Sequence, residues 1–337
     1  MILLEAKGVN VVYQPGRGER IWAVRDVSLS LEEGEFVGVV GESGCGKSTL
    51  GFALTQMLQP PAFLESGVIE FRGVDIAGLR GEGLRHQRRR GFAVVLQSGM
   101  NALNPVRTIH HQIGDVLQAH KLGGEHWSKD AVHDRGVELL GMVGLDSSVL
   151  GRFPHELSGG MRQRAAIALA LALEPELIVF DEPTTALDVI VQAALMEMIK
   201  ELQRARGFTA LLISHDMSVV LDATDRAIVM YAGRIVEDQG SMQMVQGGRH
   251  HPYTEALFRC YADPRADDVV LQDIPGSPPD LSLPDSSCAF APRCTIAEGR
   301  CWHERPLLAE VGSGGAIACH LRGSSEESAM EGRQGGA

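Results

Sequence analysis

The stretch Gly41-Glu-Ser-Gly-Cys-Gly-Lys-Ser48 indicates the fold more strongly than any other part of the sequence. It fits the phosphate-loop pattern G-x-x-x-x-G-K-[ST]. The apolar run 35–40 precedes it and the amphipathic run 47–58 follows it, so a buried strand should lead into the loop and a helix should leave it. Glycines allow the positive φ angles that turn successive backbone N–H groups inward, and the helix start adds partial positive charge. The stretch therefore predicts a site for the phosphate groups of a nucleotide.

Two side chains of this loop have specific expected contacts. Lys47 is expected to reach the β- and γ-phosphates, and the Ser48 hydroxyl to bind the Mg²⁺ that bridges them. The alternative is a glycine-rich turn with an incidental lysine, and the flanking strand and helix favour the phosphate site. The residues predicted to surround the nucleotide here are Gly41, Glu42, Ser43, Gly44, Cys45, Gly46, Lys47, Ser48 and Thr49.

Two later strands are predicted to bring polar side chains to the same sheet edge. The run Leu177-Ile-Val-Phe-Asp-Glu182 has four apolar residues followed by two carboxylates, which is typical of a buried parallel strand. Ligands of open α/β sheets bind at the carboxyl ends of strands, so Asp181 is expected to contact Mg²⁺ and Glu182 to orient or deprotonate a water. The strand 209–213 should place His215 nearby. A solvated strand end and a structural histidine are the alternatives, and the phosphate loop upstream favours the Mg²⁺ interpretation.

Helical patterns lie between the phosphate loop and these strands. From about 105 to 150 apolar residues recur at helical spacing, with Ile109, Ile113, Val116 and Leu117 expected on one helix face and Val132, Val137, Leu140 and Val143 on another. This insertion ends at Leu157-Ser-Gly-Gly-Met-Arg-Gln-Arg164, where Ser158 can cap a helix that continues through the alanine-rich run 165–173. The helix start could bind an anion. Taken alone, the segment favours the simpler interpretation of a capping loop.

Composition limits the classes of protein to consider. The chain has 337 residues, 44% of them hydrophobic, which is enough for one large or two modest domains. Its net charge of −12 argues against a nucleic-acid partner, and the short basic run 85–90 has no interleaved aromatic residues. No signal-peptide pattern begins the chain, and no window of about 18 apolar residues occurs. We therefore expect a protein that stays in the cytoplasm and spans no membrane.

Four of the six cysteines crowd into the last fifth of the chain. Cys288, Cys294, Cys301 and Cys319 are spaced C-x5-C, C-x6-C and C-x17-C, without a tight C-x2-C pair. In a reducing compartment such crowding suggests a metal or cluster before it suggests disulfides. A [4Fe–4S] cluster, Zn²⁺ and unliganded buried thiols all remain open. The proline-rich connector 274–281 precedes them, and the polar tail 323–337 is expected to be disordered.

Taken together, these motifs resemble the nucleotide-binding subunit of an ATP-binding-cassette (ABC) transporter. Matching residues occur in the family's order: the A-loop aromatic, the phosphate loop, the Q-loop, the signature, the second Walker motif, the D-loop and the switch histidine. Outside the phosphate loop they are Tyr13, Gln97, Leu157, Ser158, Gly159, Gly160, Met161, Asp181, Glu182, Asp188 and His215. Met161 replaces the usual glutamine of the signature, which leaves the Ser158, Gly159 and Gly160 donors intact. The resemblance implies an α/β fold, a P-loop NTPase of ABC type with a mixed sheet core, a helical subdomain and a small C-terminal cysteine-containing extension.

The resemblance is closer to one subgroup, the ATPases of oligopeptide, dipeptide and nickel importers. It rests on the segment from Gln97 to Leu103-Asn-Pro105, on His251-Pro-Tyr-Thr254, and on the run from Pro275 to Cys294. It implies an ABC nucleotide-binding domain at 1–245 with its helical subdomain at about 98–160, an extension at 246–322 and a tail at 323–337. Some members of this subgroup carry an iron–sulfur cluster at the matching cysteines. Ser287, in place of a frequent glycine, departs slightly from their pattern.

The family also implies roles and partners. A second ATPase subunit, either a paralogue or a second copy of this chain, would pair with it. ATP would be enclosed between the phosphate loop of one subunit and the signature of the other. Tyr13 would stack on adenine, Glu182 would be the catalytic base, and Gln97 and His215 would sense the γ-phosphate. Asp188 would couple the two sites. Ser48, Gln97 and Asp181 would hold Mg²⁺.

The expected assembly includes two integral membrane permease subunits and, through them, an extracytoplasmic substrate-binding protein. The ATPase would sit peripherally on the cytoplasmic face of the cell membrane and power import of peptides. A nickel or other small-solute importer is the alternative. A soluble ABC ATPase of DNA repair or translation is less favoured, because the chain has one cassette and no heptads. A metal-binding module with a vestigial ATPase conflicts with the intact Lys47, Asp181, Glu182 and His215.

Overall fold

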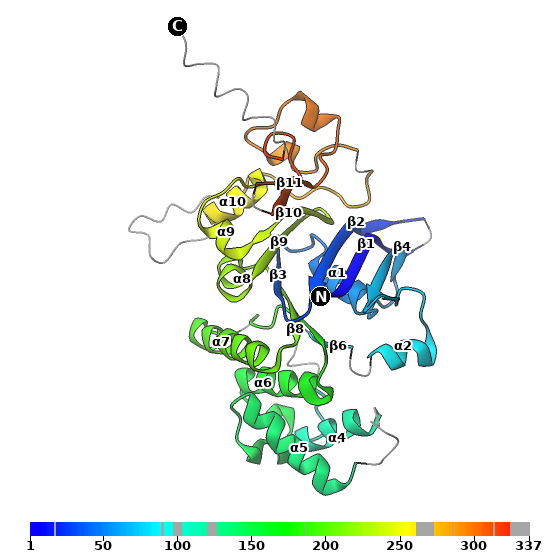
Figure 1. Ribbon diagram of the computed structural model, residues 1–337, viewed down its shortest axis with the longest axis vertical. Coiled ribbons are helices and arrows are strands. Elements are labelled where there is room, and N and C mark those ends of the chain that lie inside the picture. Colours follow the sequence, from blue (N-terminus) through cyan, green and yellow to red (C-terminus); the bar gives the residue numbers. More distant parts are fainter. Residues whose placement is uncertain are drawn as a thin grey trace.

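The computed structural model describes residues 1–16, 18–88, 91–96, 103–119, 127–185, 187–260, 273–284, 286–312 and 314–323. Figure 1 shows a helical part at one end, the C-terminal extension at the other and the sheets between them. The strands are β1 Ile2–Tyr13, β2 Ile21–Glu32, β3 Phe36–Val40, β4 Ala62–Phe71, β5 Val74–Asp75, β6 Phe92–Val95, β7 Leu177–Asp181, β8 Thr209–Ser214, β9 Arg226–Tyr231, β10 Arg234–Gly240, β11 Ala309–Val311 and β12 Gly315–Ile317. The helices are α1 Lys47–Leu54, α2 Gly81–Arg88, α4 Ile109–Ala119, α5 Lys129–Met142, α6 Gly159–Ala170, α7 Val189–Arg206, α8 Met217–Ala223, α9 Ser241–Val245 and α10 Pro252–Cys260.

An eight-stranded sheet carries the predicted site at its edge. Its order is β11-β12-β10-β9-β3-β8-β7-β6, and the strands from β9 to β6 are parallel whereas β10, β12 and β11 are antiparallel. The residues of β3, β7 and β8 are all buried, as expected for apolar parallel strands that are covered on both faces. The predicted mixed-sheet α/β class is confirmed.

A second, antiparallel sheet of order β2-β1-β4-β5 packs beside the first (Figure 1). Its inward side chains, such as Val9 and Leu31, share one apolar cluster with Leu50 of α1 and with Val37 and Ile213 of the large sheet. The helix that carries the end of the phosphate loop is therefore enclosed between the two sheets.

The helical part contains α4, α5, α6 and the 3₁₀ turn Ser147–Gly151. Ile113 and Leu117 of α4 and Leu140 of α5 are buried in the main core cluster. Val137, expected on the same face as Val132, is instead 38% exposed. At about 100° per residue, five positions of helix turn a side chain by roughly 140°, so the two valines point to different sides.

Helix α1 is shorter than the sequence predicts. It ends at Leu54 rather than at about residue 58. Gln56 adopts a left-handed conformation with a φ of 55°, and the Thr55 hydroxyl donates to the carbonyl of Gly51. The helical hydrogen-bond pattern cannot continue through such a residue, so the apolar pattern extended beyond the true helix end.

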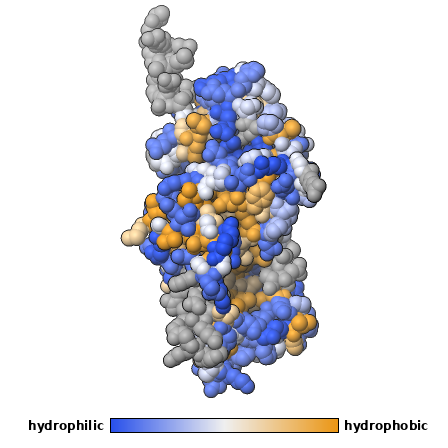
Figure 2. All heavy atoms as spheres, turned by 90° about the vertical axis from the view of Figure 1, so that its right-hand side faces the viewer, coloured by the Kyte–Doolittle hydropathy of each residue, from blue (hydrophilic) through white to orange (hydrophobic). Residues whose placement is uncertain are grey.

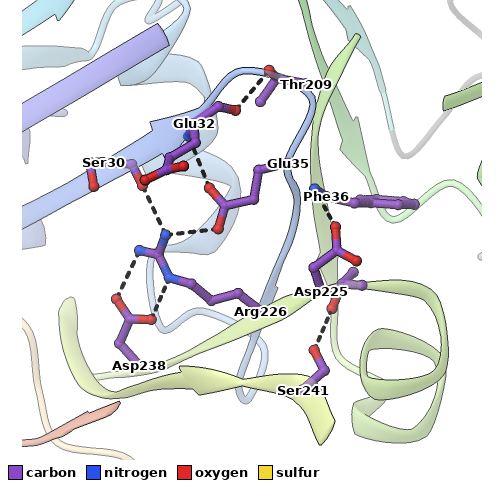
Figure 3. A network of polar contacts seen from close by, with 10 residues as sticks. Ser30, Glu32, Glu35, Phe36, Thr209, Asp225, Arg226, Asp238 and Ser241 are labelled. Carbon is purple, nitrogen blue, oxygen red and sulfur yellow. Dashed lines mark hydrogen bonds and ion pairs between the residues drawn. The ribbon is translucent and has the colours of Figure 1, made fainter. Parts of the chain in front are cut away.

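A polar network anchors the base of β3, at the end opposite the phosphate loop (Figure 3). Arg226 donates to both carboxylate oxygens of Asp238 at 2.7 and 3.0 Å and to Glu35 at 3.1 Å. The N–H of Phe36 donates to Asp225 at 3.0 Å. These contacts tie β9 and β10 to the turn before β3, which holds the strand that delivers the loop.

The C-terminal extension joins the large sheet instead of standing apart from it. Strand β12 pairs with β10, placing Ile317 opposite Glu237, and the N–H of Ala318 donates to Val236 at 2.8 Å. The domain boundary near residue 245 stays a prediction. Gly323, expected to begin the tail, is buried. Gln97, Ala186 and residues 324–337 lie outside the described residues.

Figure 2 shows the side of the molecule that carries the antiparallel sheet, where apolar residues gather across the middle and polar residues cover much of the two ends. None of the helices in the described part of the chain is both long and apolar enough to span a bilayer.

Candidate nucleotide-binding site

The loop from Gly41 to Ser48 connects β3 to α1, as predicted. Gly46 has a φ of 105°, and a Cβ there would lie 2.1 Å from the carbonyl oxygen of Ala23, so only glycine fits. At Gly44, with a φ of 81°, a Cβ would meet no atom within 4 Å. One side of the loop is therefore packed against the protein and the other is open, as a phosphate cradle requires.

Lys47 lies within this loop. It is buried, and its Nζ donates to the carbonyl oxygens of Gly41 at 2.7 Å and Glu42 at 3.0 Å. The ammonium group is thus held where phosphates would enter the cradle. Burial raises the pKa of the neighbouring Cys45 thiol, so this side chain is a neutral packing group.

Two oxygen groups meet where Mg²⁺ is expected. The Ser48 hydroxyl donates to Oδ1 of Asp181 at 2.7 Å. Burial raises the pKa of Asp181, and the hydrogen bond from Ser48 opposes that shift. A hydroxyl and a carboxylate are the hard oxygen ligands that Mg²⁺ prefers, so these two residues fit the ion.

Glu182 and His215 form the next pair along the sheet edge. His215 Nδ1 lies 3.1 Å from Glu182 Oε2, and the Thr185 hydroxyl donates to the same oxygen at 2.8 Å. Glu182 has a φ of 46°, an uncommon conformation for a residue with a side chain. Its N–H donates to Ile213 of β8 at 2.9 Å. Contacts from two segments, the end of β8 and the turn that follows β7, therefore hold the strained backbone and the carboxylate of Glu182 in place.

Other predicted residues lie at helix starts. The Ser158 hydroxyl accepts from the N–H of Met161 at 3.3 Å and caps α6, as predicted, and Asp188 caps α7 by accepting from Val191 at 2.9 Å. Gly160 packs closely on α7, since a Cβ there would lie 3.0 Å from Val191. Leu157 is buried, whereas Gly159 and Met161 are half-buried.

Tyr13 ends β1 beside the loop helix. Its hydroxyl lies 3.1 Å from the Thr49 hydroxyl. The structure therefore gathers the phosphate loop, Tyr13, Asp181, Glu182 and His215 in one region, while the signature begins a helix of the helical part. Gln97 cannot be placed, because it lies outside the described residues.

Two further residues, which the sequence motifs did not predict, lie at this site. Tyr253 and Arg293, both from the C-terminal extension, contact Glu42 of the phosphate loop. They stand in the segments His251-Pro-Tyr-Thr254 and Pro292-Arg293, but 211 and 251 positions separate them from Glu42. No local signal in the sequence predicts such contacts.

The four clustered cysteines line one pocket, together with His251 and Phe290. They are free thiols, and burial raises the pKa of Cys288 to about 11. Yet the described part of the chain contains no set of three or more His, Cys, Asp or Glu side chains arranged to hold a metal ion. The cysteines are gathered as expected, but in the described part of the chain their arrangement is not that of a ligand set for either centre that the sequence left open, a [4Fe–4S] cluster or Zn²⁺.

Comparison with known proteins identifies the family. The family model for ABC transporters matches residues 24–185, and the model for the C-terminal region of oligopeptide/dipeptide transporters matches residues 238–301. The oligopeptide transport ATP-binding protein OppD of Bacillus subtilis is 39% identical over 313 residues, covering 92% of this chain and 86% of that protein. This chain belongs to the ABC transporter family. It is an ATPase of the ATP-binding-cassette type, as the sequence predicts.

Other ABC proteins match over comparable lengths. The dipeptide transport ATP-binding protein DppD of Caldanaerobacter subterraneus is 36% identical over 321 residues, covering 95% of this chain and 97% of that protein. A solved structure of the ATP-binding cassette MJ0796, a dimer bound to ADP and Pi, superimposes with a TM-score of 0.63 and 30% identity. It covers 71% of this chain and 98% of that chain. The likeness to ABC cassettes thus extends to the three-dimensional fold.

Proposed function

We propose that this chain is the ATP-hydrolysing subunit of a membrane importer for peptides. The observation that carries the proposal is the convergence of the phosphate loop, Ser48, Asp181, Glu182 and His215 at one sheet edge. The peptide assignment is supported by the match of residues 238–301 to the C-terminal region of oligopeptide/dipeptide transporters and by the names of the relatives.

Each residue of the site has a proposed role. The loop N–H groups and Lys47 bind the phosphates, and Tyr13 stacks on adenine. Ser48 and Asp181, with Gln97, hold Mg²⁺, which neutralises charge on the phosphates when bound. Glu182 accepts a proton from the attacking water, and His215, whose Nδ1 lies 3.1 Å from Glu182 Oε2, orients the γ-phosphate.

A second ATPase subunit completes the site in this proposal. The N-terminus of α6, with Ser158, Gly159 and Gly160, faces the partner's ATP, and Asp188 couples the two sites. Val189 and Ile190, which begin α7 next to Asp188, are each 82% exposed. Two large apolar side chains beside the D-loop are expected where another subunit covers the surface. A relative of the fold, MJ0796, is described as a dimer.

The remaining partners follow from the same proposal. Two permease subunits bind the ATPase at the cytoplasmic face of the membrane, and a separate binding protein delivers the peptide. Closure of the ATPase pair on ATP and its opening after hydrolysis drive the permeases between two states. Import of nickel or another small solute is the alternative, and a non-transport ABC ATPase is the less favoured one.

The test is co-expression of the full chain with the permeases and partner ATPase encoded beside it. We expect these proteins to copurify from detergent-solubilised membranes, and peptide-loaded binding protein to stimulate ATP hydrolysis. If only nickel-loaded binding protein stimulates hydrolysis, the transported substrate is nickel and not a peptide. ATPase activity that copurifies with no membrane protein and responds to nucleic acid or ribosomes would overturn the transport proposal.

A separate proposal concerns the cysteines. Cys288, Cys294, Cys301 and Cys319 would hold a [4Fe–4S] cluster or, alternatively, zinc. It is supported by their convergence on one pocket. The four cysteines would have to bind as thiolates and shift into ligand geometry, which a bound centre can drive.

A further inference from the structure

The C-terminal extension contacts the nucleotide site at Glu42 of the phosphate loop. We propose that Arg293 and Tyr253 are positioning residues that set the geometry of the phosphate loop by binding the side chain and the backbone of Glu42. This inference rests on the proposed ATPase function. It assigns to the extension a part in nucleotide binding.

Arg293 binds the Glu42 carboxylate with both ends of its guanidinium group. Nη1 donates to Oε2 at 2.7 Å and Nη2 donates to Oε1 at 2.9 Å. Nε donates to the carbonyl of Pro275 at 2.8 Å, and Nη1 lies 3.3 Å from the hydroxyl of Tyr231. Arg293 is buried, and the Glu42 hydrogen bonds raise its pKa, so it stays charged. All three guanidinium nitrogens of Arg293 have partners, so its position is fixed. The bidentate pair therefore restrains the Glu42 carboxylate strongly.

Tyr253 restrains the backbone of the same residue. Its hydroxyl accepts the N–H of Glu42 at 2.8 Å. The ring is fully buried, 4.6 Å from the ring of Tyr231 and 5.4 Å from that of Phe290, measured between centroids. Burial raises the pKa of Tyr253, so the hydroxyl remains protonated. A rigid acceptor therefore sets the direction of the Glu42 peptide group.

The restraint extends to the ammonium group of the loop. The carbonyl oxygen of Glu42 accepts from Lys47 Nζ at 3.0 Å. Tyr253 and Arg293 hold the N–H and the carboxylate of the residue whose carbonyl helps to place Lys47. The extension thus acts on phosphate binding indirectly, through Glu42.

Attachment of the extension does not depend on Glu42. Strand β12 pairs with β10, and Arg25 of β2 donates to the carbonyls of Leu281 and Leu283 at 2.6 and 2.9 Å. These contacts already fix the extension to the cassette. A buried arginine directed at a partly exposed loop carboxylate is therefore better explained by control of the loop.

The experiment measures the Kd of the full-length chain for Mg·ATP by titration calorimetry. We expect Arg293→Met to weaken binding about tenfold and Tyr253→Phe several-fold, the order expected for a lost charge-assisted pair and a lost neutral hydrogen bond. Glu42→Gln combined with Arg293→Met should be no weaker than the more impaired single variant, because both remove one interaction. Arg293→Lys, which keeps the charge without the fork, should restore part of the affinity.

Arg300→Met is the matched control. Arg300 also binds a glutamate in a bidentate manner, Glu304 at 2.8 and 3.1 Å, within the same extension, but it is exposed and bonds away from the loop. The Kd of the Arg300→Met variant for Mg·ATP should equal that of the unmodified chain. Hydrogen exchange of the peptide 40–50 should accelerate in Arg293→Met and Tyr253→Phe, and not in Arg300→Met.

The outcomes separate this inference from the proposed function. Unchanged Kd and exchange in both Arg293→Met and Tyr253→Phe, or additive losses in the double variant, would overturn the positioning role. If Arg293→Met does not fold, Arg293→Lys and Tyr253→Phe decide by the same measurements. An unmodified chain that binds no Mg·ATP would overturn the proposed function instead.

Discussion

The Ser48 hydroxyl donates a 2.7 Å hydrogen bond to Oδ1 of Asp181 and so joins the start of α1 to the end of β7. The two residues are 133 positions apart. The same two oxygens are the proposed Mg²⁺ ligands, so an entering ion would use a geometry that the protein already holds. Preformed oxygen ligands need little rearrangement when the ion binds with ATP.

Asp181→Asn should remove the part of ATP affinity that depends on Mg²⁺. The amide keeps the size of the side chain and still accepts from Ser48, but it lacks the negative charge that attracts the ion. We expect Mg·ATP binding to weaken about tenfold or more, and binding of ATP in EDTA to stay unchanged. Titration calorimetry in both buffers measures this. Equal losses in both buffers would mean that Asp181 supports the fold of the site rather than the ion.

Glu182→Gln should abolish most hydrolysis while keeping ATP binding. The amide cannot take up a proton from water, and loss of a general base costs roughly 10²–10⁴-fold in rate. Steady-state ATPase activity of the assembled transporter is the measurement. Glu176→Gln, at the residue just before the start of the same strand and paired there with Arg72, is the control with near-normal turnover. Comparable turnover in the two variants would show that a residue other than Glu182 is the general base.

Ser158→Arg should block hydrolysis at the partner's site and leave the isolated chain's ATP affinity unchanged. The arginine would fill the space at the N-terminus of α6 where the partner's nucleotide is proposed to bind. Ser128→Arg is matched to it, because Ser128 caps α5 by accepting from Ala131 at 3.1 Å and loses a comparable cap. Similar ATPase losses in both variants would show that a lost cap, and not the trans contact, is responsible.

His251→Asn should make stability less sensitive to acid. His251 is buried, its Nδ1 accepts the N–H of Tyr253 at 3.0 Å, and burial lowers its pKa from 6.5 to about 3. Between these values the unfolded chain binds the additional proton, so stability is present above about pH 6.5 and falls as the pH drops. Asparagine keeps an acceptor near the Nδ1 position and has no proton to gain.

Urea unfolding at pH 7 and pH 5 tests this. His251 should contribute a loss of roughly twentyfold in the folding equilibrium constant of the unmodified chain over this interval, which is absent in the variant. Glu237, which accepts the N–H of His251, and the neighbouring His250 are unchanged in the variant, so the comparison isolates the contribution of His251. Parallel pH profiles would contradict the prediction.

The cysteine proposal predicts a colour. Protein purified without oxygen should be brown, with absorbance near about 400 nm from thiolate-to-iron charge transfer, and Cys294→Ser should lose it. Cys45→Ser, in the phosphate loop, should stay brown and serves as the control. Colourless protein that contains one zinc per chain would show that the cysteines bind zinc and not an iron–sulfur cluster. Four freely titratable thiols without metal would reject both centres.

Local patterns predicted much of the fold and of the nucleotide site. Strand, loop and helix around Gly41 to Ser48 follow from apolar periodicity and glycine placement, and the cap at Ser158 follows from residue type at a helix start. These signals act over a few residues. The end of α1 escaped them, because the apolar pattern continues past Gln56 while the backbone there turns left-handed.

The sequence by itself therefore determined the family, the order of the motifs and the chemical type of each predicted site residue. Only the tertiary structure decided that β12 and β11 extend the cassette sheet beyond β10 and that Arg293 and Tyr253 hold Glu42. The physical reason is range. Periodicity, capping and turn chemistry are set by neighbours in the chain, whereas a contact across 251 positions exists only after the whole chain has packed.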